Sequence, residues 1–189
     1  MKRLFRRYAF VAAFCFAASM PSAAQTLIAA TGDSNIDGKL VDRSEAYPAK
    51  LEHWLQSRGY NVKVVNTGIS GDTTAGLLAR LDSAVPEGTK IAVISIGIND
   101  TRKGTGSKHF FDPDQSQANV DMIASKLKGR GITLYMFSRT GAGAIPLGEF
   151  FDGVRDLKYR AADGRHLNPA GYDLVVARTA PKIARSLKR

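Results

Sequence analysis

The stretch LIAATGDSNIDG, Leu27 to Gly38, runs from small and apolar residues directly into Gly32-Asp33-Ser34. Gly, Asp, Ser and Asn are the residues that turns require, so one interpretation is simply the first loop after a strand. A second interpretation is that Ser34 is a nucleophile held at the end of a buried strand. The stretch is compatible with both, and the choice depends on the rest of the chain.

Apolar strand patterns alternate with amphipathic helix patterns along the chain. Strands are predicted at residues 26–31, 61–66, 90–96 and 132–138. Helices are predicted at residues 44–58, 73–84, 114–128 and from Pro169 toward Leu187, with Pro181 as a kink or break. Residues 140–162 are predicted as loops with a short helix or edge strand. This alternation predicts one α/β domain with a parallel sheet covered on both faces.

The first 24 residues have the pattern of a secretory signal peptide. Basic residues (Lys2, Arg3, Arg6 and Arg7) precede an apolar run, and Ser22-Ala23-Ala24 offers a small-residue cleavage site. The apolar run is short for a membrane span, although an uncleaved anchor is the alternative. We therefore expect an exported bacterial protein, periplasmic or secreted, with residues 1–24 removed and residues 25–189 forming the domain. Cys15, the single cysteine, lies in the removed segment, so we expect neither a disulfide nor a thiol nucleophile.

The formal net charge is +10, and removing the four basic residues of the signal segment leaves +6. Lysines and arginines are scattered rather than interleaved with aromatic residues in a dense run, so we expect no nucleic-acid partner. Asp112 and Asp114 lack further ligands for a metal site, and no histidine pair has zinc spacing. The segment from Gly104 to Lys108 fails the spacing of a phosphate-binding loop. We expect no metal and no cofactor.

Polar residues follow the predicted strands at the point where each strand ends. Ser34 follows the first strand, Gly71 follows the second, and Asn99 follows the third. Asp163 and His166 stand just before the last helix. Because ligands bind outside the carboxyl ends of the strands in open parallel sheets, these residues are expected to converge on one edge.

His166 is the candidate general base for Ser34, because a free serine is a poor nucleophile and needs a base within hydrogen-bond reach. His53 reads as a helix-face histidine, and His109 lies in a loop rich in Gly and Lys. Asp163 precedes His166 by three residues, a spacing that lets its carboxylate fix Nδ1 and leave Nε2 for Ser34. The alternative is a helix N-terminal turn in which Asp163 or Asn168 only caps.

Three groups are candidate donors for an oxyanion: the backbone N–H of Ser34, the backbone N–H of Gly71 and the side-chain amide of Asn99. Taken one at a time, Gly71 and Asn99 are equally typical of ordinary turns. The four segments together, in order, favour an acyl-transfer site.

The four segments resemble the blocks of the SGNH (GDSL-type) hydrolases: Gly32-Asp33-Ser34, Ser70-Gly71-Asp72-Thr73, Gly97-Ile98-Asn99-Asp100 and Asp163-Gly164-Arg165-His166. The stretch ISGDTTAGLLARL is similar to the bacterial periplasmic thioesterase I, lysophospholipase and arylesterase subgroup. The resemblance implies a flavodoxin-like three-layer α/β/α fold with a mostly parallel sheet of about five strands. It also implies ester or thioester hydrolysis through an acyl-enzyme, without a metal.

Carried over by position, the resemblance makes Ser34 the nucleophile, His166 the base and Asp163 its orienter, with Ser34, Gly71 and Asn99 as oxyanion donors. Two features depart from the family. Asn35 stands where an apolar residue is usual, and the segment between Asp100 and Asp163 is short. The motif is also not the Gly-x-Ser-x-Gly elbow, since Ile36 stands at the second Gly.

The first hypothesis is therefore a serine esterase for a small ester or thioester with a short acyl, aryl or lysophospholipid-type group. A second is an O-acetyl esterase or acetyltransferase acting on cell-envelope polysaccharide, because the chemistry before deacylation is the same. A third is a non-catalytic envelope-binding domain that keeps the fold. Phe110 and Phe111, in the loop after Asn99, are candidates either for contact with the acyl or aryl group or for anchoring that loop.

Overall fold

The computed structural model describes residues 24–100, 112–139 and 145–187. Several sequence predictions lie outside the described residues: Cys15 with nearly all of the predicted signal peptide, the segment from Gly104 to Lys108, His109, Phe110 and Phe111. Within the described residues, no helix is long and apolar enough to span a bilayer.

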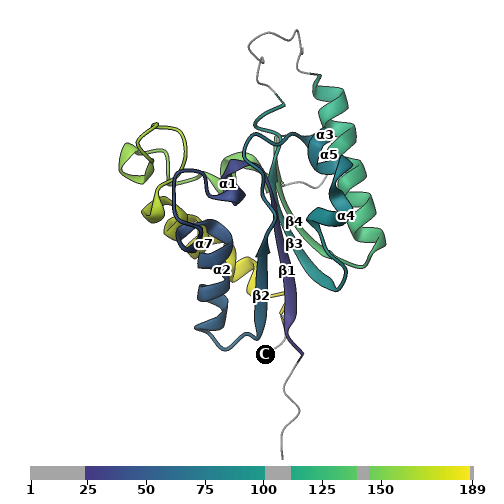
Figure 1. Ribbon diagram of the computed structural model, residues 1–189, viewed down its shortest axis with the longest axis horizontal. Coiled ribbons are helices and arrows are strands. Elements are labelled where there is room, and N and C mark those ends of the chain that lie inside the picture. Colours follow the sequence, from purple (N-terminus) through teal and green to yellow (C-terminus); the bar gives the residue numbers. More distant parts are fainter. Residues whose placement is uncertain (1–23, 101–111, 140–144, 188–189) are drawn as a thin grey trace, which may run out of the picture.

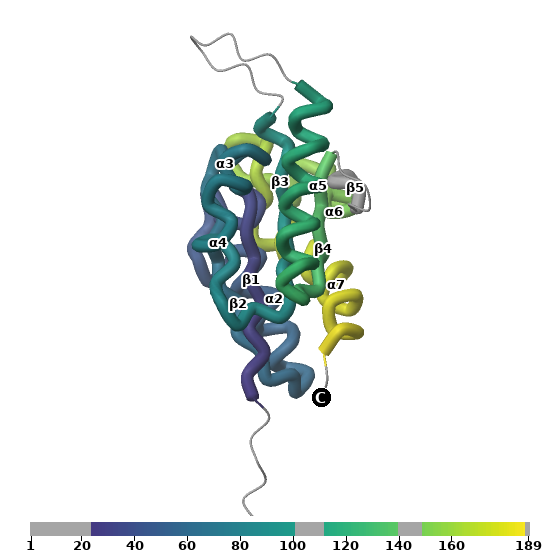
Figure 2. Tube along the Cα trace, turned by 90° about the vertical axis from the view of Figure 1, so that its right-hand side faces the viewer, coloured from purple at the N-terminus to yellow at the C-terminus, as the bar shows by residue number. Residues whose placement is uncertain are grey.

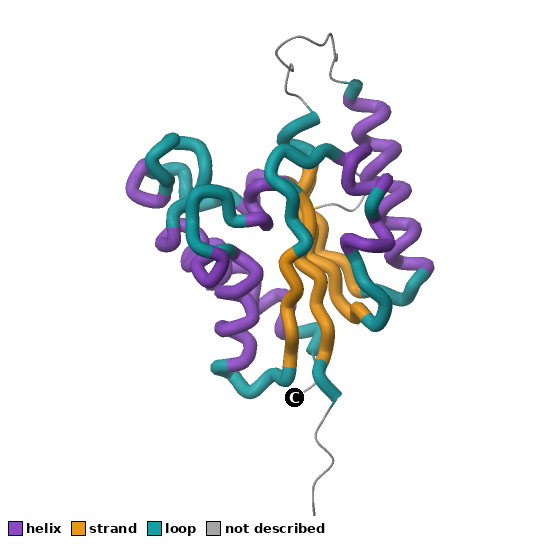
Figure 3. The backbone as a smooth tube through the Cα atoms, in the orientation of Figure 1, coloured by secondary structure: helices purple, strands orange, loops and turns teal. Residues whose placement is uncertain are grey.

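The core of the fold is a five-stranded sheet in the order β2-β1-β3-β4-β5. Figure 3 colours strands orange. Its strands are β1 Thr26–Gly32, β2 Val62–Asn66, β3 Thr89–Ile96, β4 Thr133–Ser138 and β5 Ile145–Pro146. Every neighbouring pair is parallel. The predicted parallel sheet is confirmed, and β5 is the short edge strand expected within residues 140–162.

Helices cover both faces of the sheet, which gives the three-layer α/β/α arrangement (Figures 1 and 2). One face carries α1 Ser34–Asp37, α2 Tyr47–Gln56, α6 Leu147–Phe150 and α7 Pro169–Ala184. The other carries α3 Thr74–Ala79, α4 Leu81–Ala84 and α5 Pro113–Gly129. Two 3-10 turns complete the described elements: η1 Arg43–Glu45 and η2 Leu157–Tyr159.

Two separate hydrophobic cores hold these layers together, because side chains of the central strands alternate between the faces. On β3, Ile91 and Val93 belong to the core beneath α2 and α7, whereas Ala92 and Ile94 belong to the core beneath α3, α4 and α5. This explains why the β3 sequence is almost continuously apolar.

Three predicted helices differ from the observed ones. The helix expected at residues 44–58 is interrupted at Ala46, whose extended backbone separates η1 from α2. The helix expected at residues 73–84 is broken at Arg80 into α3 and α4. The last helix includes Pro181 and ends at Ala184, short of the predicted Leu187.

Gly32 lets β1 and β3 approach closely at the carboxyl edge. Its φ is +134°, and a Cβ at this position would lie 1.9 Å from the carbonyl oxygen of Ser95 on β3. The next residue donates its N–H to that same oxygen over 3.0 Å. Only glycine fits here, and the chain leaves the sheet directly into Asp33 and Ser34.

Candidate active site

Ser34 is the first residue of the short helix α1, which sits at the carboxyl end of β1 (Figure 1). Asp33 caps this helix, because its Oδ1 accepts the backbone N–H of Asn35 over 2.9 Å. Gly38, in the left-handed region with φ +87°, ends it. The Ser34 amide is therefore at the first position of a helix, where an N–H has no acceptor within the helix.

Asn35, the residue that departs from the family pattern, is buried and holds Asp33. Its side-chain Nδ2 donates to Asp33 Oδ1 over 2.8 Å, in addition to the backbone bond. The other carboxyl oxygen of Asp33 is buried without a hydrogen-bond partner among the described residues. Burial raises the pKa of Asp33 to about 7, against the lowering effect of the two Asn35 bonds. The turn before the nucleophile thus contains a carboxyl group that gains its charge only near neutral pH.

His166 lies between Ser34 and Asp163, as the sequence predicts. Its Nε2 is 3.0 Å from Ser34 Oγ, and its Nδ1 is 2.5 Å from Asp163 Oδ2. Asp163 Oδ1 accepts the backbone N–H groups of Arg165 and His166, both over 2.9 Å. These bonds, together with the imidazole contact, hold the pKa of Asp163 well below its ordinary value. The carboxylate is therefore ionised and turned toward Nδ1.

Asn168 fixes the loop that carries His166 at the start of α7. Its Oδ1 accepts the Gly171 N–H over 2.9 Å, so it is the helix cap that the alternative interpretation required. Its Nδ2 donates to the carbonyl oxygens of Lys158 and Arg160 over 2.7 and 3.1 Å. Capping and orientation of the imidazole are thus divided between two residues, Asn168 and Asp163.

The predicted oxyanion donors come from the neighbouring strand ends. Gly71 is exposed with φ +89°, and a Cβ there would meet no atom within 4 Å, so the space beside its backbone is open. Asn99 is buried, and its Nδ2 donates to the carbonyl oxygen of Asp72 over 2.9 Å. The Gly71 loop is tied to β1, since the Ile69 N–H donates to the Gly32 carbonyl over 2.9 Å.

A partly buried polar contact joins the segments of Gly71 and Asn99. Asp100 accepts both the backbone N–H and the hydroxyl of Thr74, the latter over 2.5 Å. Thr74 Oγ1 in turn accepts from Asn119 Nδ2 of α5 over 3.1 Å. Neither Thr74 nor Asn119 is predicted as a site residue from the sequence, because a lone Thr or Asn in a helix pattern carries no periodic signal.

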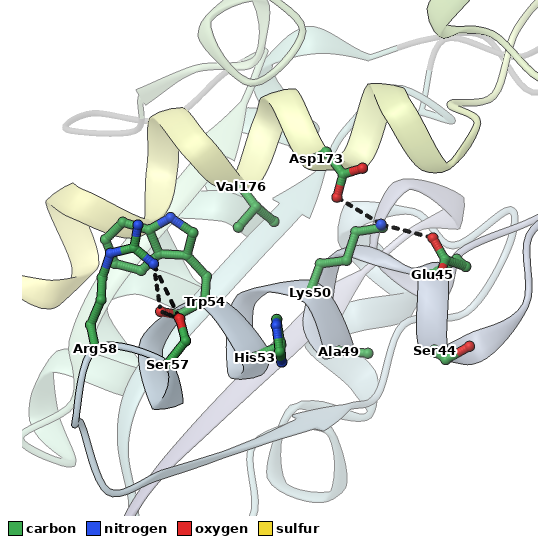
Figure 4. A pocket seen from close by; sticks show the side chains of 10 residues that line it. All are labelled: Ser44, Glu45, Ala49, Lys50, His53, Trp54, Ser57, Arg58, Asp173 and Val176. Carbon is green, nitrogen blue, oxygen red and sulfur yellow. Dashed lines mark hydrogen bonds and ion pairs between the residues drawn. The ribbon is translucent and has the colours of Figure 1, made fainter.

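A groove of about 510 Å³ between α2 and α7 lies apart from these residues (Figure 4). The charged groups that line it are already paired. Lys50 Nζ sits 2.8 Å from Glu45 and 2.7 Å from Asp173, and the Arg58 guanidinium stacks 3.7 Å above the Trp54 ring. His53 also lines it and is exposed, as predicted for a helix-face histidine. None of the predicted site residues lines this groove.

Among the described residues, no cluster of three or more His, Cys, Asp or Glu side chains could hold a metal ion. Asp112, considered above as an isolated acid, caps α5 by accepting the N–H groups of Asp114 and Gln115, both over 3.0 Å.

Comparison with known proteins identifies the family of the chain. Residues 30–152 match the model of the GDSL-like lipase/acylhydrolase family. The chain is 39% identical over 111 residues to esterase TesA of Pseudomonas aeruginosa, covering 58% of this chain and 52% of that protein. It is 30% identical over 134 residues to an arylesterase of Vibrio mimicus, covering 70% of this chain and 63% of that protein.

A crystal structure of TesA superposes with a TM-score of 0.71 at 27% identity and covers 86% of this chain and all of that one. By sequence, in contrast, the chain spans only 52% and 63% of the lengths of the two curated relatives.

Proposed function

Because the chain belongs to the GDSL-like lipase/acylhydrolase family, we propose that it is a serine hydrolase of small carboxylic esters or thioesters. The observation that carries the proposal is the line of contacts from Ser34 through His166 to Asp163, with 3.0 Å between Oγ and Nε2 and 2.5 Å between Nδ1 and Oδ2. A hydroxyl beside an imidazole whose tautomer is fixed by a carboxylate is suited to acyl transfer.

In the proposed mechanism, Ser34 Oγ attacks the acyl carbon while His166 Nε2 takes its proton. Asp163, ionised, stabilises the imidazolium that forms. The negative charge that develops on the acyl oxygen is stabilised by the N–H groups of Ser34 and Gly71 and by the Asn99 amide. His166 then returns the proton to the leaving alcohol or thiol, and a water molecule repeats the sequence to release the acid from Ser34.

Two relatives named as an esterase and an arylesterase support ester chemistry for this chain. We extend the proposal to an exported protein, periplasmic or secreted, in which residues 1–24 are removed and residues 25–189 form the enzyme. The basic, apolar and small-residue order of that segment supports the export proposal.

The test is hydrolysis of a p-nitrophenyl ester series, from acetate to long chains, by the chain from Gln25 onward and by its Ser34→Ala variant. Ser44→Ala, which changes an exposed serine in the groove between α2 and α7, is the matched control. We expect turnover by the unmodified chain and by Ser44→Ala only. Equal turnover by Ser34→Ala would exclude Ser34 as the nucleophile.

A fluorophosphonate probe separates an inactive fold from an enzyme with a different substrate. Labelling that Ser34→Ala abolishes supports an activated serine even where no p-nitrophenyl ester turns over. Absence of both labelling and turnover would favour the binding-domain hypothesis. Transfer to a sugar acceptor in place of release of free acid would favour the acetyltransferase hypothesis.

A further inference from the structure

Arg80 stands at the break between α3 and α4, and its side chain reaches the end of β1 and the loop that contains Gly71. Its backbone has φ −109° and ψ 15°, outside helical values, so the helical path stops at this residue. Its side chain is folded inward and is only 20% exposed. In Figure 1, α3 and α4 flank the sheet on the side opposite to α2 and α7.

The guanidinium of Arg80 contacts two segments of the carboxyl edge, the end of β1 and the loop between β2 and α3. Nε and Nη2 donate to Asp72 Oδ2 over 2.9 and 2.7 Å, and Nη1 donates to the Thr67 carbonyl over 2.8 Å. Nη2 also lies 3.4 Å from the Gly32 carbonyl and from Thr31 Oγ1. One side chain thus joins the end of β1 to both ends of the loop that contains Gly71.

These two segments carry two of the proposed oxyanion donors, and the Asp72 carbonyl holds the third. Gly32 stands two residues before Ser34, whose amide is the first donor. Asp72 directly follows Gly71, the second donor. The Asp72 carbonyl accepts the amide of Asn99, the third, over 2.9 Å.

Chain connectivity alone does not fix these donors relative to one another, because they follow three different strands. Stabilisation of an oxyanion requires donors that are already in place before the charge develops.

We propose that Arg80 is a positioning residue that fixes the three oxyanion donors relative to one another. This inference rests on the proposed function. Arg80 acts through Asp72 and the carbonyls of Gly32 and Thr67 and does not touch the substrate. Lysine cannot replace it fully, because a point charge cannot contact a carboxylate and separate carbonyl oxygens with the fixed fork of a guanidinium.

Arg130 provides a matched control. Its guanidinium also donates to two backbone carbonyls, Val85 over 2.6 Å and Pro86 over 3.2 Å, and lies 3.8 Å from Asp82. Those partners precede β3 and lie at the amino edge of the sheet, away from Ser34. Substitution of Arg130 therefore removes a similar set of contacts without reaching the proposed donors.

Gly76 offers a second variant that leaves every charge in place. A Cβ at Gly76 would lie 2.2 Å from Asp72 Oδ1, so Gly76→Ala must displace the carboxylate that Arg80 holds. Alanine also favours a helix more than glycine does, which offsets part of the steric cost to stability. This variant keeps the proposal testable if Arg80→Gln does not fold.

The experiment compares kcat, KM and Tm for p-nitrophenyl acetate hydrolysis by the unmodified chain, Arg80→Gln, Arg80→Lys, Gly76→Ala and Arg130→Gln. We expect Arg80→Gln to lower kcat about a hundredfold, the loss typical of one oxyanion donor, with KM little changed. Arg80→Lys should recover part of the loss, and Gly76→Ala should lower kcat about tenfold. Arg130→Gln should lower Tm while kcat stays within about threefold of the unmodified value. The pH at which activity is half-maximal should stay the same in all variants.

Retention of kcat within threefold in Arg80→Gln, an equal loss in Arg130→Gln, or a shifted pH midpoint would overturn the positioning role. Absence of turnover by the unmodified chain together with absence of Ser34 labelling would instead overturn the proposed function, so the two failures are distinguishable.

Discussion

His166 Nε2 and Ser34 Oγ lie 3.0 Å apart, although the two residues are separated by 132 positions in the chain. The contact exists because Ser34 leaves the sheet at the end of β1, and His166 enters from the opposite end of the sequence, just before α7. Asp163 is close to His166 through a local turn, whereas Ser34 is close to it only through the fold. Experiments on the site therefore have to distinguish changes in the Asp163–His166 turn from changes in the packing that brings His166 to Ser34.

Asp163→Asn tests the orientation of the imidazole. An asparagine Oδ1 can still accept the N–H groups of Arg165 and His166 and preserve the turn. Its NH₂ group would then face Nδ1 as a donor, which forces the proton of the imidazole onto Nε2 and removes the base. We expect kcat for ester hydrolysis to fall about 10⁴-fold with little change in Tm.

Asp156→Asn is the matched control for that variant. Asp156 caps η2 by accepting the Lys158 N–H over 3.1 Å. Like Asp163, it lies in the segment between α6 and α7 that precedes His166. Its activity should remain near that of the unmodified chain. A comparable loss of kcat in both variants would mean that the conformation of the segment before His166, and not the tautomer of its imidazole, determines the rate.

Asn99→Ala tests the oxyanion assignment. The substitution removes a side-chain amide from the carboxyl edge and also its bond to the Asp72 carbonyl. Since the donor matters most when charge develops, we expect kcat to fall about 10²- to 10³-fold while KM changes little. A rise in KM at unchanged kcat would assign Asn99 to ground-state substrate binding instead.

The placement of the predicted site residues at one edge of the sheet is the feature most readily predicted from the sequence. Ser34, Gly71, Asn99 and His166 each follow a strand or precede a helix, and parallel strands bring their carboxyl ends to one edge. The proximity of these residues therefore depends on the order of the helices and strands and not on the exact residues at which each helix or strand ends. The predicted helix at residues 73–84 overran the break at Arg80 without affecting this result.

Residues that hold the segments of the site in place are much harder to predict from the sequence. Arg80 occupies one position within a helix pattern whose leucines dominate the periodicity, and its contact with Asp72 depends on the break that the pattern did not predict. The sequence places Asp33 in a turn and in the Gly32-Asp33-Ser34 block, and neither pattern predicts its burial. Its burial depends on Asn35 and on the approach of β3, which no short-range pattern encodes.

Asp33 should make stability fall as the pH rises toward neutrality. Its pKa is raised from 3.8 to about 7, chiefly by burial. Between these values the folded state keeps a proton that the unfolded state has lost, so the free energy of unfolding decreases as the pH rises from about 4 to 7 and then levels off. Asp33→Asn removes this contribution and should be the more stable protein at pH 8.

Urea unfolding of the unmodified chain and Asp33→Asn at pH 4.5 and pH 8 measures that difference. We expect similar stability at the lower pH, where the carboxyl is protonated and resembles the amide. At the higher pH the variant should gain on the order of 3–4 kcal/mol, because each unit of pKa difference between the folded and unfolded states corresponds to about 1.4 kcal/mol. An identical change of stability with pH in both proteins would place the responsible group elsewhere.

Gly32→Ala should prevent the nucleophile turn from forming. Its Cβ would lie 1.9 Å from the Ser95 carbonyl oxygen, a backbone atom that cannot move without separating β1 from β3, and φ +134° adds strain. We expect a loss of more than about 4 kcal/mol of stability, a size reserved for severe steric defects.

Gly88→Ala separates backbone strain from the clash, because Gly88 has φ +82° and a Cβ at that position would meet no atom within 4 Å. It should cost only about 1–2 kcal/mol, the strain of a left-handed non-glycine residue. Urea unfolding of both variants gives the comparison. Equal losses would show that φ alone decides the requirement for glycine. A much larger loss at Gly32 would show that the contact with Ser95 sets the distance between β1 and β3, and with it the place from which Ser34 faces His166.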